Sequence, residues 1–342
     1  PLDVTQELMA ALELNAGAQG NMTLALGGTM DDPVLSARIV LSNANFDGTD
    51  LDGLALLADD VRLNPQLSAR IGARVPYGTD GVTVAGNLAA DEVFSTFMLN
   101  DLRIAGMGAA LQGNLSYGLD NGLARGQMSG GISDLGALNE IAGGTLSGTA
   151  LIDLVMDGSA AGGQDVALRL AMAGLAFDDM TVADARMAVD VSDVLNQPSL
   201  SLQASVDNAA AAGEQIDRLL IQANGPLDSL AMSLDAKGAS WDLATRAHGN
   251  LVAGVDVEVS ALSGSIDDRP LEAKGPFHFS MAGNDIALSG LELTAAGGTL
   301  VADIRHLNTD TTADVTLTGL PIEFLSHWSG ALDLKGTLEG FL

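Results

Sequence analysis

The feature that most constrains this chain is an alternation of aliphatic and small polar residues with a period of two. Residues 200–207 place Leu, Leu, Ala and Val at the even positions and Ser, Gln, Ser and Asp at the odd positions. Residues 255–259 place three valines at odd positions and two acids between them. Because successive side chains of a strand point to opposite faces, each segment predicts a strand with one apolar and one polar face.

Turn residues separate the alternating segments at short intervals. Asn121-Gly122, Asp157-Gly158 and Gly283-Asn284-Asp285 are typical of tight reversals. Segments of about 8 to 12 residues between such turns favour consecutive antiparallel hairpins over crossover units. Two stretches, Ser133 to Gly143 and Pro321 to Gly330, have apolar residues at three-residue spacing and predict short helices.

These patterns predict an all-β fold. No break in composition divides the chain, so we expect residues 1–342 to form a single elongated region. We expect an elongated, curved antiparallel sheet that forms a U-shaped hydrophobic groove, with one or two short helices. Because residue 1 is Pro and the alternation is already established by Met22, we interpret the sequence as part of a longer chain, with any membrane anchor outside it.

The charge balance narrows the range of partners. The chain has 44 acidic residues against 15 Lys and Arg, which gives a formal net charge of -29. Nucleic acid binding depends on clustered basic residues, so we expect no nucleic acid partner. The same acidity argues against lying flat on an anionic membrane.

The sequence offers little for catalysis or metal binding. Its four histidines, at positions 248, 278, 306 and 327, have no metal-ligand spacing, and there is no cysteine. The acidic pairs at 31–32, 59–60, 178–179 and 267–268 match no calcium-binding loop and are more typical of solvated turns. No nucleophile elbow or phosphate-binding glycine loop is present. We therefore predict a protein that is not an enzyme and has no cofactor, with a hydrolase built on a concealed carboxylate pair as a remote alternative.

The apolar face then becomes the candidate functional surface. A closed sandwich core would give the same alternation. Only 4% of residues are aromatic whereas 47% are hydrophobic, which favours an aliphatic trough over a core of large interlocking side chains. The predicted lining of this trough for lipid consists of Leu24, Leu26, Ile39, Leu41, Leu154, Met156, Leu168, Leu170, Val189, Leu200, Leu202, Leu219, Ile221, Met232, Leu234, Val255, Val257, Val259, Phe277, Phe279, Leu291, Leu293, Leu300, Ile304, Val315, Leu317, Leu332 and Leu334.

Two functions fit an alternating sheet of this kind. The first is a hydrophobic groove that carries lipid. The alternative is a secreted or surface β-solenoid interaction protein, adhesin-like, with a filled core. Lipid that co-purifies with the chain would favour the groove.

Several local patterns resemble a known family. They are the segment Gly28-Thr29-Met30-Asp31-Asp32-Pro33-Val34-Leu35, the strand ends Gln222-Ala223-Asn224-Gly225 and Asp235-Ala236-Lys237-Gly238, and the stretch from Gly330 to Leu342. In these features the chain is similar to the TamB translocation and assembly module family, within the wider AsmA-like group of bacterial envelope proteins.

The resemblance implies a location and partners. It implies a β-taco or repeating-groove body in the periplasm, with the parent protein anchored in the inner membrane by a segment absent here. It also implies an Omp85-type outer-membrane partner of the parent protein. The implied roles are phospholipid movement between the two membranes and outer-membrane protein assembly, so the expected partners are phospholipid acyl chains and nascent outer-membrane β-strands.

Overall fold

The computed structural model describes most of the chain. The described residues are 16–46, 49–51, 53–63, 66–76, 81–158, 162–211, 214–252, 254–307, 310–321 and 337–341. By its internal contacts the chain divides into two compact units, unit 1 (residues 1–178) and unit 2 (residues 179–342).

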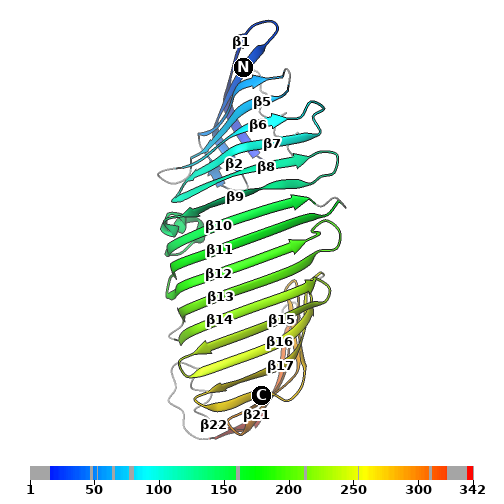
Figure 1. Cartoon of the computed structure of the whole chain (residues 1–342). Coiled ribbons are helices and arrows are strands. Elements are labelled where there is room, and N and C mark those ends of the chain that lie inside the picture. Colours follow the sequence, from blue (N-terminus) through cyan, green and yellow to red (C-terminus); the bar gives the residue numbers. More distant parts are fainter. Residues whose placement is uncertain are drawn as a thin grey trace. The chain divides into compact units, whose positions relative to one another are not determined.

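Unit 1 is an antiparallel meander in which strands that follow one another in the sequence pair with one another (Figure 1). The short strand β3 pairs with the end of β2, next to β4. The strands are β1 (Ala16–Gly28), β2 (Pro33–Phe46), β3 (Thr49–Leu51), β4 (Leu54–Arg62), β5 (Ser68–Val75), β6 (Val82–Ala90), β7 (Thr96–Gly106), β8 (Ala109–Gly118), β9 (Ala124–Ile132), β10 (Leu146–Gly158) and β11 (Gln164–Phe177).

Unit 2 has the same antiparallel meander, with one interruption. The long strand β17 pairs through one half with β18 and through the other with β19, and β20 pairs with both. The strands are β12 (Met180–Ser192), β13 (Ser199–Ala211), β14 (Glu214–Pro226), β15 (Leu230–Gly238), β16 (Trp241–Asn250), β17 (Val255–Ile266), β18 (Arg269–Ala273), β19 (Phe277–Ala282), β20 (Asp285–Ala295), β21 (Gly298–Leu307), β22 (Asp310–Pro321) and β23 (Thr337–Phe341).

The fold class predicted from the alternation, all-β and antiparallel, is confirmed. Asn121-Gly122 and Gly283-Asn284 lie in hairpin turns, as predicted. The prediction for Asp157-Gly158 was wrong, because these residues are the last two of β10 and still pair with β11.

The first of the two predicted helical stretches contains two very short elements. Leu135–Leu138 form the 3-10 helix η1, and Asn139–Ala142 form a single turn of α-helix, α2. Asp134 caps η1, since its side chain accepts a hydrogen bond from Gly136 N at 2.8 Å. Apart from Pro321, which belongs to β22, the second stretch lies outside the described residues.

Candidate apolar binding face

One row of side chains crosses unit 1 from its first strand to its last. Directly opposed residues of an antiparallel pair have side chains on the same face of the sheet, so the register of successive strands defines the row. We call it the unit 1 row: Met22, Ile39, Leu56, Ala73, Val84, Ile104, Leu111, Gly130, Ile152 and Leu170. All of its members except two glycine or alanine positions are large aliphatic residues or methionine.

The neighbouring row on the opposite face is polar over the last five strands of the unit. In order it contains Arg103, Gln112, Ser129, Asp153 and Arg169. All five are exposed. The period of two in the sequence therefore places an apolar row on one face and, over β7 to β11, a polar row on the other, although Leu151 and Val155 are exposed on that second face.

Unit 2 repeats this arrangement. Its register places in one row, the unit 2 row, the side chains of Val189, Leu202, Ala223, Met232, Ala247, Val259 and Phe277. A polar row follows on the other face and includes Gln203, Gln222 and Ser233. The apolar face of unit 2 thus extends without a charged residue from β12 to β19 along this row.

Most of the predicted lining residues have similar exposure. Most are half-buried, including Leu154, Leu168, Leu202, Ile221 and Val257. A second layer packed over this face would bury such side chains almost completely. Among the described residues, Leu230 is the only large side chain less than 2% exposed. Neighbours on the same face therefore supply most of the cover of these side chains.

Three of the predicted lining residues depart from this pattern. Leu24 and Leu26, on β1, are 57% and 78% exposed, whereas Leu41 is only 6% exposed. Leu332 and Leu334 lie outside the described residues. The remaining predicted residues, which are all half-buried, are Ile39, Met156, Leu170, Val189, Leu200, Leu219, Met232, Leu234, Val255, Val259, Phe277, Phe279, Leu291, Leu293, Leu300, Ile304, Val315 and Leu317.

In two places the apolar side chains form packed clusters of buried residues. In unit 2, Ile266, Leu271 and Ala295 are buried and contact half-buried neighbours that include Trp241 and Leu300. In unit 1, Leu41 and Leu54 are buried against Ile39 and Val75. The predicted lining residues Leu293, Leu300, Leu317, Ile39 and Leu41 therefore belong to packed clusters.

Sequence reasoning missed the part of the apolar face that lies on β4 to β8. Its members there include Leu56, Val84, Ile104 and Leu111. The reason is clearest in β7, which contains one residue more than both of its neighbours between Leu99 and Leu102. This bulge moves the apolar side chains from odd to even positions, which breaks the period of two that reveals the other strands.

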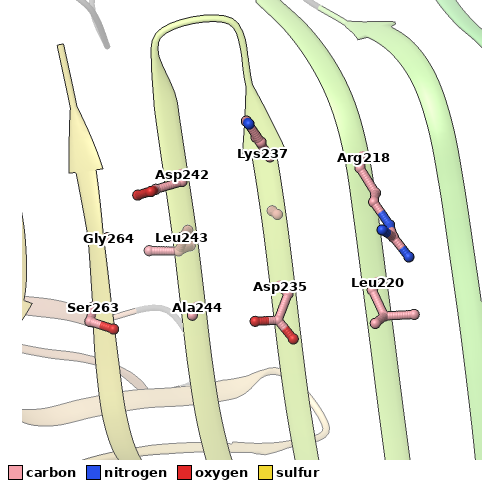
Figure 2. Close-up of a pocket in the computed structure, with 10 residues that line it drawn as sticks. Arg218, Leu220, Asp235, Lys237, Asp242, Leu243, Ala244, Ser263 and Gly264 are labelled. Atoms are coloured by element: carbon pink, nitrogen blue, oxygen red, sulfur yellow. The ribbon is translucent and has the colours of Figure 1, made fainter. Parts of the chain in front are cut away.

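A hollow of about 410 Å³ lies over β14 to β17, and its charged side chains belong to the polar face. Figure 2 shows Lys237 and Asp242 on the two strands of one hairpin, with Arg218 on the next strand. The register continues to Asp207 on the far side of Arg218, so the charges across the four strands run negative, positive, positive, negative. Arg218, Lys237, Asp235 and Asp242 are all exposed. Because the positive and negative side chains lie next to one another and are exposed, we interpret them as solvated surface charges and not as a site for a bound ion.

The side chains with catalytic or metal-binding potential are dispersed. His278 pairs with Asp256 on the adjacent strand, and His306 Nδ1 lies 2.8 Å from Thr311 Oγ1. His248 is exposed, and His327 lies outside the described residues. Within the part of the chain that the structure covers, no group of three His, Asp or Glu residues is arranged to hold a metal ion.

One carboxylate has a perturbed pKa. The hydroxyl of Ser95 hydrogen-bonds Asp91 and is the main cause of its lowered pKa; desolvation opposes this shift, and the backbone N–H groups of Thr96 and Ser95 lower the pKa further. Ser95 N donates to Asp91 Oδ1 at 2.6 Å. The carboxylate fastens the loop between β6 and β7, which is a structural role.

Comparison with known proteins identifies no relative. No family model, no curated protein and no solved structure matches the chain. Among the described residues, none of the helices has the length and apolar character needed to cross a membrane.

Proposed function

We propose that the apolar face of each unit binds the acyl chains of phospholipid and acts as a groove along which lipid moves. The observation that carries this proposal is the unit 1 row, in which aliphatic side chains succeed one another over ten strand positions. The side chains of this row are half-buried except Met22 and Leu56, which are 45% and 37% exposed, and the row therefore supports an apolar surface that can accept hydrocarbon.

An apolar surface of this kind would lower the free energy cost of moving a lipid through water. Each acyl methylene exposed to water costs about 0.8 kcal/mol, so two chains of about 16 carbons cost roughly 25 kcal/mol. A continuous aliphatic lining removes most of this cost at every point along the path. A lining without a specific headgroup pocket also suits movement, because a tight pocket would hold its lipid in place.

The setting of this activity follows from the resemblance to the TamB and AsmA-like proteins. We place the chain in the periplasm, where its apolar faces would carry phospholipid between the inner and outer membranes. The parent protein would be anchored in the inner membrane and would meet an Omp85-type outer-membrane partner. Shielding of nascent outer-membrane strands would use the same apolar surface.

The test is the lipid content of the purified chain. The variant Leu202→Asp places a charge in the unit 2 row, and Gln203→Asp places the same charge on the exposed polar face of the same strand. We expect phospholipid, measured by mass spectrometry after extraction, to co-purify with the wild type and with Gln203→Asp. Leu202→Asp should lose most of this lipid while its far-ultraviolet circular dichroism remains that of a β-sheet. Absence of lipid from the wild type would contradict the proposal.

A second function, an interaction protein with a filled core, is favoured by one observation. The cluster around Ile266, Leu271 and Ala295 is packed by side chains from β16 to β22, as expected for a closed end. If the filled core extended through unit 2, Leu202→Asp would unfold the unit, and the wild type would contain no lipid. These two results together would favour the second function.

A further inference from the structure

Exposed apolar side chains gather at one end of the strands of unit 1. Successive connections of an antiparallel meander alternate between the two strand ends, so the connections that follow β1, β4, β6 and β8 lie at the same end. Each of these connections contains a large apolar residue that is exposed. We call these residues the unit 1 tips: Met30 at 99%, Leu63 at 67%, Val93 at 78%, Phe94 at 45% and Leu119 at 54% exposed.

Contacts between neighbouring connections hold the tips side by side. The contacts are the ion pair of Arg62 with Asp32, the hydrogen bond from Ala90 N to Leu67 O at 3.0 Å and the hydrogen bond from Leu119 N to Ser95 O at 2.7 Å. The tips therefore form one line that crosses the strands. Neighbouring connections along this line are about 9.6 Å apart, because two strand spacings separate them.

The opposite end of the same strands differs. Within its described connections no large apolar side chain is exposed, and Met107 and Leu135 are buried. Unit 2, taken by itself, has the same asymmetry. Val194, Leu195 and Val252 are exposed in connections at one strand end, whereas the described connections at its other end contain only Ala, Ser, Gly and Asp. Because connections are normally polar, apolar tips confined to one strand end indicate a contact surface.

Unpaired carboxylates accompany the tips. Asp31, Glu92 and Asp120 each adjoin a tip in the sequence and are exposed, and none of them has an ion pair within the described part of the chain. The arginines near the tips are already paired: Arg62 with Asp32, Arg70 with Asp60 and Arg125 with Asp157. The surface is therefore apolar at the tips and negatively charged beside them.

We infer that the unit 1 tips dock a separate polypeptide that presents a basic amphipathic helix. The apolar stripe of the helix covers the tips, and Lys or Arg beside the stripe meets Asp31, Glu92 and Asp120. The spacing agrees with this occupant. Seven residues of a helix rise about 10.5 Å, so one heptad spans nearly the distance between neighbouring connections.

Charge favours this occupant over three others. A second copy of the chain carries the same net charge of -29 and would be repelled. A bilayer would draw the carboxylates into its headgroup layer together with the tips, at a cost in desolvation. The segments of this chain outside the described structure lack the necessary charge, since residues 1–15 contain three acids and no Lys or Arg, and residues 322–336 contain two acids and one Lys.

The probe for this surface is a synthetic helix of four heptads with Leu on one face and Lys and Ala elsewhere. It is acetylated, amidated and carries a fluorophore, and fluorescence anisotropy measures its binding to the complete 342-residue chain. The control probe has Glu in place of every Lys and keeps the Leu face. We expect the first probe to bind and the control probe to bind at least about tenfold more weakly. Equal binding of the two probes would overturn the inference.

A matched pair of double variants separates the tips from the general acidity of the chain. Val93→Ser with Leu119→Ser removes two tips, whereas Leu151→Ser with Val155→Ser removes the same two residue types from exposed positions of β10. Neither variant changes the charge, and both should keep the urea midpoint of the wild type. The first should weaken binding of the basic probe at least about tenfold, and the second should leave it unchanged. Equal binding by the two variants would mean that charge alone holds the probe, which would overturn the inference.

Photo-crosslinking identifies what covers the tips. A photoreactive amino acid in place of Val93 should form an adduct with the basic probe. Without the probe, an adduct with residues 1–15 or 322–336 of the same chain, with a second copy, or with phosphatidylcholine in added vesicles would reveal a different occupant. Each of these three results would overturn the inference. The inference does not depend on the lipid proposal, and the lipid content of the purified chain is measured separately, so the two can fail independently.

Discussion

At the scale of single residues, some strand positions require glycine because their backbone adopts a positive φ. Gly126 of β9 has a φ of 143°, and a Cβ at this position would overlap Asn114 O on β8. We predict that Gly126→Ala lowers the free energy of unfolding by at least about 2 kcal/mol, from backbone strain and steric overlap together. Urea denaturation measures this, with Gly275→Ala as the control because no atom lies within 4 Å of its Cβ position. Equal midpoints for the two variants would contradict the account.

Gln164 joins three strands through its side chain and is the buried polar residue of the described core, at 7% exposed. Its Nε2 donates to Asp157 O at 3.0 Å and Asp165 O at 3.1 Å, and its Oε1 accepts from Ala124 N at 2.7 Å. Gln164→Leu would leave these groups without partners and should lower the free energy of unfolding by roughly 2 kcal/mol. Gln203→Leu, on an exposed position, serves as the control in the same denaturation experiment. If Gln164→Leu lowered the free energy of unfolding no more than the control does, water would be replacing the hydrogen bonds of the Gln164 amide, contrary to this prediction.

Asp91 gives the chain a defined acid sensitivity. Its pKa in the folded chain lies below the ordinary value of 3.8 because Ser95 and the N–H groups of its loop hydrogen-bond the carboxylate. The resulting stabilisation is complete well above pH 3.8 and is lost as the pH falls through the lower folded pKa. Asp91→Asn should therefore be less stable than the wild type at neutral pH, and the difference should shrink on acidification. A difference that grows below pH 3.8 would have the wrong sign.

At the scale of strands, the sequence predicts regular elements well and interrupted elements poorly. Strands without bulges in their central parts, such as β10 and β13, keep their apolar residues at one parity and could be identified directly. The apolar face of β7 could not, because Asp101, with a φ of 53°, is part of a bulge that reverses the parity. Nor does the alternation reveal that β18 and β19 act together as one partner of β17, since Lys274 to Pro276 interrupt them.

The bulge of β7 predicts how the chain responds to deletion of a single residue. Since β7 has one residue more than β6 and β8, deletion of Asp101 would restore a regular ladder and keep Leu99, Leu102 and Ile104 on the apolar face. We predict a folded chain whose stability in urea changes by no more than about 1 kcal/mol. Deletion of Gln112, in β8, would instead turn the residues that follow it to the wrong face and should abolish the cooperative transition. Similar losses from the two deletions would contradict the register.

At the scale of the whole molecule, the sequence predicts which residues share a face but not what lies against that face. The all-β antiparallel class follows from the alternation, because a period of two with turns at short intervals has few other solutions. The proposed groove, by contrast, would depend on how strongly each unit curves, and the alternation does not encode curvature, to which bulges and glycines contribute. Ile266 shows this limit of the sequence. It is buried in a packed cluster, but the alternation in β17 does not distinguish it from the half-buried apolar residues earlier in the same strand.

The central claim, that hydrocarbon lies along the apolar face of each unit, is tested most directly by photo-crosslinking to phospholipid. A photoreactive amino acid replaces Ile104, Ile152 or Leu202 on the apolar face, or the sequence neighbours Arg103, Asp153 or Gln203 on the polar face. The account predicts phospholipid adducts, detected by mass spectrometry of the complete chain, at all three apolar positions and at none of the polar ones. Adducts at both sets of positions, or at neither, would contradict it.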